Sequence, residues 1–492
     1  MTTATPEFDL LIRDVRVVRP HGNSVHTTDI AIAGERIALV APGIAPQRAK
    51  VVEEGGGRLA FPGVVDAHMH SGIYAPLQED AVSESRAAAM GGVTSSLNYF
   101  RTGQYYLNKG GPYAEFFPQV LALAEGRFHV DYGFHLAPMD RTHIDELPML
   151  IERHGVSSFK IFMFYGSHGL HGASDSQREF LMIGEGERYD VAHFEFVMRG
   201  LQRAREHLPD KAAQISLSLH CETAEIMTAY TRLVEQDASL QGLGAYSASR
   251  PPHSEGLAVF TAAYLAHETA LPNINLLHLS SRKAVQAAMM MSQTFPHIDF
   301  KREVTIGHLM LDITSPAGEL AKVNPPIRPR EDVEYLWRAL LDGQLDWVVS
   351  DHACCRHETK VPRHYFGNIW MAKSGFGGTE YLLPALVSEG TRRGMSYHHM
   401  ARVTSWNPAQ RYGLNRKGDI APGYDADIAL VDPARTWTIR AAESPSTQGY
   451  TPFEGLELSA AVTATYLRGQ KIFENGQLLG APRGRYLHRP TS

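Results

Sequence analysis

The sequence predicts an α/β fold: a TIM barrel of eight parallel strands alternating with helices, flanked by a β-sandwich domain. Two observations predict it. From residue 59 onward, short β-rich runs alternate with helical stretches, and eight strand–helix repeats are the number that closes a TIM barrel. The two chain ends, in contrast, contain short β-rich runs joined by turns, and neither end is long enough to build a good core alone.

The barrel is expected over residues 59–410. Its eight strands are expected at LAFPGVVDAH (59–68), TSSLNYF (94–100), FHVDYGFHLA (128–137), SSFKIFMFY (157–165), ISLSLHCE (215–222), NINLLHLS (273–280), REVTIGHLML (302–311) and LDWVVSDHA (345–353). Helices are expected between them, for example over 79–90, 190–208 and 331–343.

Both chain ends are expected to pair into one β-sandwich beside the barrel. Residues 1–58 would supply its N-terminal part and residues 411–480 its C-terminal part. Asn475-Gly476 is a strong signal for a tight hairpin turn within the second part. Residues 481–492 are rich in Pro, Gly and Arg, and we expect a C-terminal tail or subunit arm there.

Composition excludes several classes of protein. Of the 492 residues 43% are apolar and 20% charged, which is a globular rather than a disordered balance. No apolar run reaches the length of a membrane helix, and the N-terminus has no signal-peptide pattern. A net charge of −6 gives no electrostatic case for a nucleic-acid or membrane partner. Three cysteines fit a reducing compartment, so a cytoplasmic location is expected.

Six polar residues fall at the carboxyl ends of five expected strands, where TIM barrels carry their reactive groups. They are His68, His70, Lys160, His220, His278 and Asp351. Each has a structural alternative: a lone strand His is commonly a hydrogen-bonded core residue (as we expect for His135 and His308), Lys160 could form a core salt bridge, and Asp351 could cap a helix. Together, and with HxH alternation placing His68 and His70 on one face, the set predicts a metal site.

These residues sit in motifs that resemble the amidohydrolase superfamily. The motifs are FPGVVDAHMH, SSFKIFMFY, LHCE, LLHLSS, NPPIRPREDVEYLWRAL, VVSDHA and NPAQRYGLNRKGDIAPGYDADIALVD. They look most like the cyclic amidohydrolases, namely dihydropyrimidinase, hydantoinase and allantoinase, from about residue 7 to 480. The resemblance implies a (β/α)8 barrel, a flanking β-sandwich from both chain ends, and two divalent metal ions per subunit, usually zinc.

The resemblance also implies a role for each of the six residues. His68 and His70 would bind the more buried ion, His220 and His278 the more exposed one, Lys160 would bridge both after carboxylation by CO2 to N6-carboxylysine, and Asp351 would bind the buried ion and act as general base and acid. A bridging hydroxide would then attack a ring amide. Tyr165 matches the tyrosine that stabilises the oxyanion in the family, although an aromatic residue there could instead pack in the barrel mouth.

The substrate is expected to be a small cyclic amide: a dihydropyrimidine, a hydantoin or a related ureide or imide. Gly72 stands where dihydroorotases have an Arg, and Tyr165 is a residue that allantoinases usually lack. Asn324 and Gly377 occupy substrate-binding positions where the branch usually has Ser and Asn. The alternatives are an allantoinase-like or dihydroorotase-like hydrolase of another ring, or a catalytically silent oligomeric scaffold.

An insertion after the fourth expected strand and a pair of adjacent cysteines lie near the predicted site. The 166–190 insertion could be a lid near the site, with His168 and His171 within reach of substrate, or a surface excursion. The adjacent Cys354 and Cys355 are expected to be small buried residues near the barrel mouth rather than a metal or redox pair. A homotetramer or homodimer is expected, because relatives are commonly tetramers.

Overall fold

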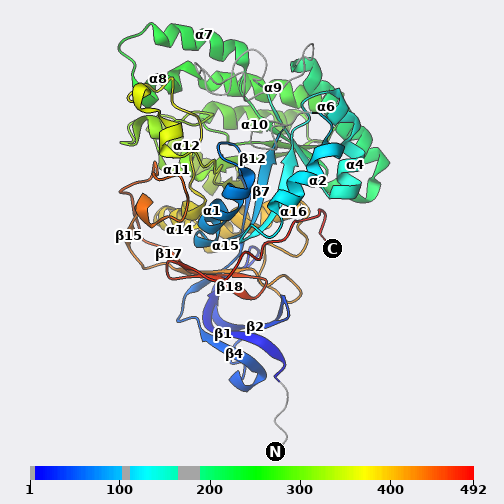
Figure 1. Ribbon diagram of the computed structural model, residues 1–492, viewed down its shortest axis with the longest axis vertical. Helices are drawn as coiled ribbons and strands as arrows, with labels where there is room; N and C mark the ends of the chain where they lie inside the picture. The colour runs from blue at the N-terminus through cyan, green and yellow to red at the C-terminus, as the bar shows by residue number, and fades with distance from the viewer. Residues whose placement is uncertain (1–5, 102–110, 164–188, 492) are drawn as a thin grey trace, which may run out of the picture.

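The computed structural model describes residues 6–101, 111–163 and 189–491. Its centre is a sheet of eight parallel strands, each hydrogen-bonded to the next in chain order. A bridge between Met69 and His352 joins the first strand to the segment after the last one, so that the sheet curls into a nearly closed barrel (Figure 1). The barrel strands are β6 (Val64–Met69), β7 (Val93–Phe100), β8 (Asp131–Leu136), β9 (Ser158–Phe162), β10 (Ser216–His220), β11 (Asn273–Leu276), β12 (Asp299–Thr305) and β13 (Trp347–Val349).

Helices follow the strands and surround the barrel. They are α1 (Leu77–Met90), α2 (Tyr113–Ala124), α3 (Arg141–Asp145), α4 (Leu147–His154), α6 (Val191–His207), α7 (Ala224–Glu235), α8 (Gly242–Ser249), α9 (Pro252–Glu268), α10 (Arg282–Thr294), α11 (Ile306–Met310), α12 (Arg330–Leu341), α13 (His357–Lys360), α14 (Leu382–Arg392), α15 (Tyr397–Ala401) and α16 (Asn407–Arg411). The predicted TIM barrel is confirmed. No helix in the described ranges combines the length and the apolar character needed to cross a membrane.

The flanking domain is a mixed sheet built from both chain ends, as predicted. Its order is β19-β18-β17-β14-β5-β1-β2-β3, with β4 pairing with β1 as well. The strands are β1 (Phe8–Val17), β2 (His26–Ala33), β3 (Arg36–Ala41), β4 (Ala49–Glu54), β5 (Leu59–Pro62), β14 (Ile428–Asp432), β17 (Ala461–Leu467), β18 (Gln470–Glu474) and β19 (Gln477–Leu478). The two ends meet where β14 pairs antiparallel with β5. The predicted Asn475-Gly476 turn joins β18 to β19, with both residues at positive φ.

The run predicted as the first barrel strand divides between the two domains. Leu59–Pro62 forms β5 of the flanking sheet, and only Val64–Met69 enters the barrel. Gly63 allows the change of sheet, because a Cβ there would lie 2.2 Å from the Thr94 hydroxyl, far too close for any other residue. A second expected strand, 302–311, is also shorter than predicted. It ends at Thr305, whose side chain caps α11 by accepting a hydrogen bond from His308 N.

Two of the barrel strands each end two residues before a predicted ligand. β11 ends at Leu276 and β13 at Val349, so that His278 and Asp351 lie in the loops rather than at the strand ends. Both take a positive φ, 32° and 53°. Side chains other than Gly adopt this conformation at a cost, and such backbone strain concentrates at functional sites.

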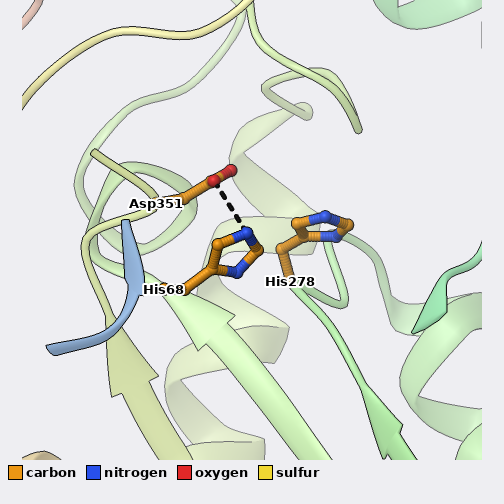
Figure 2. Close-up of side chains that lie close together, drawn as sticks. All are labelled: His68, His278 and Asp351. Carbon is orange, nitrogen blue, oxygen red and sulfur yellow. Dashed lines mark ion pairs between the residues drawn. The ribbon is translucent and has the colours of Figure 1, made fainter. Parts of the chain in front are cut away.

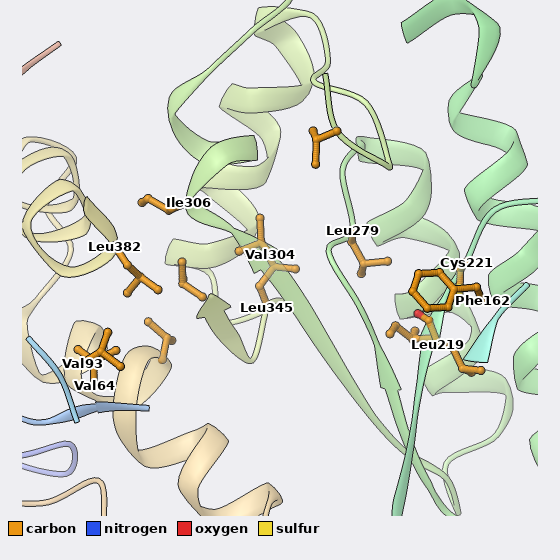
Figure 3. Packing of buried hydrophobic residues seen from close by; sticks show 14 of the residues in the cluster. Val64, Val93, Phe162, Leu219, Cys221, Leu279, Val304, Ile306, Leu345 and Leu382 are labelled. Atoms are coloured by element: carbon orange, nitrogen blue, oxygen red, sulfur yellow. Dashed lines mark hydrogen bonds between the residues drawn. The ribbon is translucent and has the colours of Figure 1, made fainter. Parts of the chain in front are cut away.

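Apolar side chains fill the space between the barrel strands and the helices. Figure 3 shows part of this core, in which Leu219 and Cys221 pack near Phe162. The barrel strands also carry buried polar side chains, among them His135 on β8. His135 hydrogen-bonds Ser158 Oγ and the carbonyl of Ala67 (3.0 Å), which is the structural role expected for that histidine.

The C-terminal residues pack against the amino-terminal end of the barrel. Leu487 N donates to the Tyr132 carbonyl (2.7 Å), and Tyr132 N donates to the Arg485 carbonyl (3.0 Å), so that the tail runs beside β8. The fully buried Arg489 side chain donates to Ser158 Oγ (2.6 Å) from below. The described part of the tail therefore closes the bottom of the barrel within its own chain.

Candidate metal centre

The six predicted ligands converge at the carboxyl-terminal mouth of the barrel. His68 and Lys160 lie within β6 and β9, His220 ends β10, and the other three follow strand ends. Figure 2 shows His68, His278 and Asp351 pointing toward one another from three different segments. One potential ligand atom from each of these three lies within 4.8 Å of the other two.

The Nε2 atom of His68 is the hub of the group. It lies 3.2 Å from His70 Nε2, 3.2 Å from Lys160 Nζ and 3.1 Å from Asp351 Oδ1. His70 Nε2 also lies 3.2 Å from Asp351 Oδ1. The His220 and His278 rings are 4.3 Å apart between centroids, and the His68 and His278 rings 5.4 Å. All six side chains therefore belong to one cluster.

Glu303, on β12, fixes the orientation of His68. Its Oε1 accepts hydrogen bonds from His68 Nδ1 (2.7 Å) and His278 N (3.1 Å), and its Oε2 accepts one from Trp347 Nε1 (2.9 Å). With its proton on Nδ1, His68 presents the lone pair of Nε2 to the cluster. A carboxylate behind a metal-binding imidazole is the usual way to set its tautomer and increase its basicity.

The protonation states suit metal binding. Burial lowers the pKa of His68, His70 and His278 well below the ordinary 6.5, so that these rings are neutral and carry an available lone pair at neutral pH. The buried Nδ1 of His278 has no hydrogen-bond partner among the described residues. Burial also raises the pKa of Glu303 to about 8, and a cation on His68 would favour its ionised form. The donor set therefore fits divalent ions with nitrogen and oxygen ligands.

Burial makes the neutral amine of Lys160 accessible near neutral pH. It is almost fully buried, and its Nζ lies 4.0 Å from the centre of the Tyr99 ring and 4.1 Å from that of Phe162. Burial is the largest cause that lowers its pKa, from 10.5 to about 7, against the opposing charges of Asp351 and Glu303. A neutral amine can react with CO2, and the resulting carbamate would be an anion able to bind cations.

A separate ion pair behind His220 sets its ring. His220 Nε2 lies 2.7 Å from Glu222 Oε2, and the same oxygen accepts a hydrogen bond from Arg250 Nη1 at 2.7 Å. All three side chains are buried. Because Nε2 is engaged by Glu222, a metal ion on this ring would bind through Nδ1.

Asp66 holds the loop that carries Asp351. Its carboxylate accepts hydrogen bonds from Ser350 N (3.1 Å), Ser350 Oγ and Thr379 Oγ1 (2.8 Å). His70 N donates to the His352 carbonyl (2.8 Å) and ties the same loop to the end of β6. These bonds stabilise the left-handed backbone that turns Asp351 toward the ligand cluster.

A cavity opens over the centre. Of the predicted substrate contacts, Asn324 is in its described lining and Gly377 is not. Asn324, Ser374 and Gly375 line it, together with His70, Lys160, His220, His278 and Asp351. Gly377 lies behind this wall, where its N donates to Gln448 Oε1 and a Cβ would meet His352. Tyr165, His168 and His171 lie outside the described residues.

Four residues at this site were not predicted from the sequence: Glu303, Asp66, Tyr99 and Arg101. Tyr99 stacks on His135 and meets the His68 ring edge-on (4.4 Å between centroids), so that it forms part of the site floor. Arg101 follows β7 and lines the cavity. The sequence indicates their role only weakly. Each is a single polar residue in or beside a β-rich run, and none forms a motif with a second polar residue at a fixed spacing.

Asp80, Glu84 and Cys354 form a second group of potential ligands, all of them buried. Glu84 already accepts hydrogen bonds from His352 Nε2 (2.8 Å), Ser446 Oγ (2.6 Å), Ser83 Oγ (2.7 Å) and Thr447 N (3.2 Å). Burial also raises the pKa of the Cys354 thiol, which keeps it protonated. Glu84 is thus satisfied without a cation and braces the loop after β13, whereas Asp80 Oδ1 has no hydrogen-bond partner among the described residues. Cys354 and Cys355 are both buried, as expected.

Residues 59–472 match the Amidohydrolase family model. The chain belongs to the amidohydrolase family. It is similar over nearly its whole length to two curated allantoinases: that of Rubrobacter xylanophilus (31% identical, 98% of this chain and 97% of the relative) and that of Deinococcus radiodurans (30%, 99% of both).

This amidohydrolase is also similar to solved structures of a dihydropyrimidinase and a D-hydantoinase. Dihydropyrimidinase from Brevibacillus agri NCHU1002 superposes with a TM-score of 0.82 at 26% identity, covering 97% of this chain and 98% of that one. D-hydantoinase from Bacillus sp. AR9 gives 0.82 and 26%, covering 98% and 100%. The family match and these relatives support a hydrolase of cyclic amides.

Proposed function

We propose that this amidohydrolase opens a ring amide in a dihydropyrimidine, a hydantoin or a related ureide or imide, using two divalent metal ions. The observation that carries the proposal is the convergence of four imidazoles, one lysine and one aspartate at one barrel mouth. Each residue type is a known metal ligand once the lysine is carboxylated. The lowered pKa values favour the neutral, ligating forms of His68, His70 and His278 and the neutral, reactive form of Lys160.

The ligands divide into two groups by their neighbours. His68, His70 and Asp351 contact one another and would hold one ion. His220 and His278, whose rings are in contact, would hold the other. Lys160, modified to N6-carboxylysine by CO2, would bridge them. We expect zinc, since nitrogen and oxygen ligands in this mixture suit it. When bound, the ions supply a water acidic enough to be nucleophilic at neutral pH and polarise the ring carbonyl.

Asp351 is the proposed general base and acid. Its side chain is about one-tenth exposed and lies on the cavity wall, so that it reaches both the ligand cluster and a bound ring. It would accept the proton of the attacking water and donate it to the departing ring nitrogen. The bonds that Asp66 makes to its loop keep the carboxylate in place through both transfers. Tyr165 is the proposed donor to the oxyanion.

The proposed substrate contacts lie opposite the ligands. The Tyr246 hydroxyl donates to Asn324 Oδ1, which sets the orientation of that amide at the cavity wall. Asn324 would then contact the ring. Ser374 and Gly375, which line the cavity, would make the contacts that were expected from Gly377. Allantoin is the second candidate ring, because the curated relatives with 30–31% identity carry the name allantoinase.

A hydrolysis screen tests the proposal. Metal-loaded protein would be offered dihydropyrimidines, 5-substituted hydantoins, allantoin and cyclic imides, with the ring-opened product measured by mass spectrometry. We expect turnover of at least one ring and about two divalent ions per chain. Asp351→Asn is expected to abolish turnover, whereas the exposed Arg356→Gln is expected to leave it unchanged. An inactive wild type without bound metal would instead support the scaffold alternative.

We also propose that the protein self-associates in the cytoplasm as a homotetramer or homodimer. Large apolar side chains are exposed on neighbouring helices: Phe196 on α6, Leu233 on α7, and Leu257 and Tyr264 on α9. Contiguous exposed apolar surface commonly marks an interface. Light scattering of the purified chain tests this, and a monomer at micromolar concentration would refute it. Three unpaired, buried cysteines support a reducing location.

A further inference from the structure

A buried lysine behind the cavity wall has no part in the proposed metal chemistry. Lys360 is the last residue of α13, in the segment that follows β13, and its side chain is fully buried. Its Nζ donates to the carbonyl oxygens of Lys322 (2.8 Å) and Gly375 (2.7 Å). Among the described residues no carboxylate pairs with this amine. A buried polar group is costly unless it is hydrogen-bonded, so that the two carbonyls are what compensates its burial.

The two carbonyls belong to two segments that both form the wall of the cavity. Asn324 follows Lys322 by two residues, Ser374 directly precedes Gly375, and Asn324, Ser374 and Gly375 all line the cavity. Gly375 N also donates to the Lys322 carbonyl (2.9 Å). The Lys322 oxygen therefore accepts two hydrogen bonds, one from the second segment and one from Lys360. Lys360 thus joins the main chains of both segments at one point.

The backbone of Gly375 depends on this junction. Its φ is 98°, a conformation that favours glycine, and a Cβ there would lie 3.0 Å from that of Ala353. Lys360 is not among the described lining residues, so that the Gly375 carbonyl is bonded behind the wall and not in the cavity. Unusual backbone of this kind persists where surrounding bonds hold it. The bonds of Gly375 to Lys322 and Lys360 supply that restraint on both sides of its peptide.

Two tyrosines hold the same segments in a different way. The Tyr246 hydroxyl donates to Asn324 Oδ1 and lies 3.4 Å from Ser374 Oγ. The Tyr74 hydroxyl donates to the Ser374 carbonyl. These bonds orient the Asn324 amide and one peptide of the second segment. Lys360 instead bonds to the main chain of both segments, and its amine therefore fixes how far apart they lie.

We propose that Lys360 is a positioning residue for the substrate: it sets the separation of segments 322–324 and 374–375, and thereby the affinity for the ring. This inference rests on the proposed function for the identity of the ring and for Asn324, Ser374 and Gly375 as its contacts. The wall contacts the ring before and during the reaction. Lys360 should therefore affect binding of the ring and not the chemical step.

The junction works in both protonation states of the lysine. Burial is the largest cause that lowers the pKa of Lys360, from 10.5 to about 7, against a smaller opposing effect of Cys355. A neutral amine has two N–H groups and an ammonium three. Either form can donate to both carbonyls, so that removal of the amine, and not of its charge, is the informative perturbation.

Hydrogen exchange of Lys360→Met tests the junction without any substrate. Methionine keeps an unbranched side chain of similar length and removes every donor. Exchange of the full chain would be followed by mass spectrometry in peptides covering 318–327 and 371–378. We expect the peptide with the Gly375 amide to exchange at least about 10-fold faster in the variant, the size expected for one lost hydrogen bond. A peptide from β10 should exchange as in wild type.

Steady-state kinetics on the ring that the hydrolysis screen identifies give the second measurement. Lys360→Met should raise KM about 10-fold and leave kcat within about 2-fold, the pattern of an interaction that contributes equally to the ground state and the transition state. Lys360→Gln keeps a shorter donor and should change both measurements in the same direction by a smaller factor. It replaces the methionine variant if that protein does not fold.

Val285→Ala is the matched control, because Val285 is fully buried on α10 and does not line the cavity. It should lower the stability of the chain but change neither KM nor exchange over 371–378. Unchanged exchange in Lys360→Met, or a lower kcat at unchanged KM, would overturn the proposal. Faster exchange throughout the barrel would overturn it as well, since the lysine would then only stabilise the fold.

The two proposals can fail separately. If wild type opens no ring, the proposed function is wrong, and exchange alone decides whether Lys360 holds the two segments. If rings are opened and exchange over 371–378 is faster at an unchanged KM, the function stands and Lys360 does not set the affinity for the ring.

Discussion

Carboxylation of Lys160 makes a quantitative prediction for the pH dependence of metal-centre assembly. Only the neutral amine reacts with CO2. Burial lowers the pKa of Lys160 from 10.5 to about 7, which raises the neutral fraction at pH 7 from about 0.03% to about 50%, a gain of more than about 1,000-fold. The neutral fraction is about 9% at pH 6 and about 91% at pH 8 by the same relation.

The assay is reconstitution of metal-depleted protein with Zn²⁺ at fixed dissolved CO2. The initial rate of activity recovery should rise about 5-fold from pH 6 to pH 7 and less than about 2-fold from pH 7 to pH 8, following the neutral fraction of Lys160. Removing CO2 should slow recovery throughout the range. Recovery that ignores CO2, or that keeps rising tenfold per pH unit above pH 8, would refute the reasoning.

Lys160→Met separates loss of chemistry from loss of fold. In the metal-free chain the free energy of unfolding decreases as the pH falls from 10.5 toward 7. In this range the lysine binds a proton in the unfolded chain, whereas its lowered pKa keeps it unprotonated in the folded chain. At pH 7 this cost is about 4 kcal/mol. The variant should therefore be inactive but more stable than metal-free wild type in urea unfolding. Full activity in Lys160→Met would contradict the proposed role of the carbamate.

Three further predictions concern the residues around the centre. Glu303→Gln should weaken metal binding by about 10- to 100-fold in chelator competition, and unchanged affinity would show that His68 does not need its carboxylate. Burial raises the pKa of Glu84, but the His352 hydrogen bond and charge outweigh it and lower the pKa to about 2. Stability present above pH 4.5 should thus be lost between pH 4.5 and 2, by about 3 kcal/mol, and Glu84→Gln should flatten this loss in acid unfolding curves. Arg489→Met should destabilise the chain by about 2–4 kcal/mol in urea, since it leaves Ser158 and a buried carbonyl without their donor; an unchanged midpoint would mean that the tail does not close the barrel.

Much of the fold could be predicted because strand spacing and hydrophobic pattern follow from backbone geometry. His68, Lys160 and His220 lie within strands, where alternation alone decides which face a side chain takes. The division of residues 59–69 between two sheets was missed, because both halves have the same apolar pattern. The decisive contact there is that of Gly63 with Thr94, which is 31 positions away in the sequence.

The residues around the ligands were harder to predict for a different reason. Glu303 acts on His68 from β12 and Asp66 acts on Ser350 from β6, so that each contacts a residue more than 200 positions away in the sequence. Neither has a partner at a fixed spacing, so that sequence alone does not distinguish them from ordinary strand carboxylates. Arg101 also required the structure, because its relevance depends on which residues share the cavity.

The backbone at the candidate metal centre shows why the residues that meet there could be predicted from the sequence and their placement could not. His278 and Asp351 follow the two shortest barrel strands, of four and three residues, and both have positive φ. If the strand continued to either position, alternation would decide which face the side chain takes. Because the strand ends earlier and a left-handed turn follows, the turn decides the direction of the side chain instead. Each turn costs about 1–2 kcal/mol, and the bonds of Glu303 to His278 N and of Asp66 to Ser350 hold the turns in place. Glu303 therefore positions a proposed ligand of one metal ion and Asp66 a proposed ligand of the other. Because both carboxylates lie on barrel strands, the strands and not the loops determine where these two ligands lie.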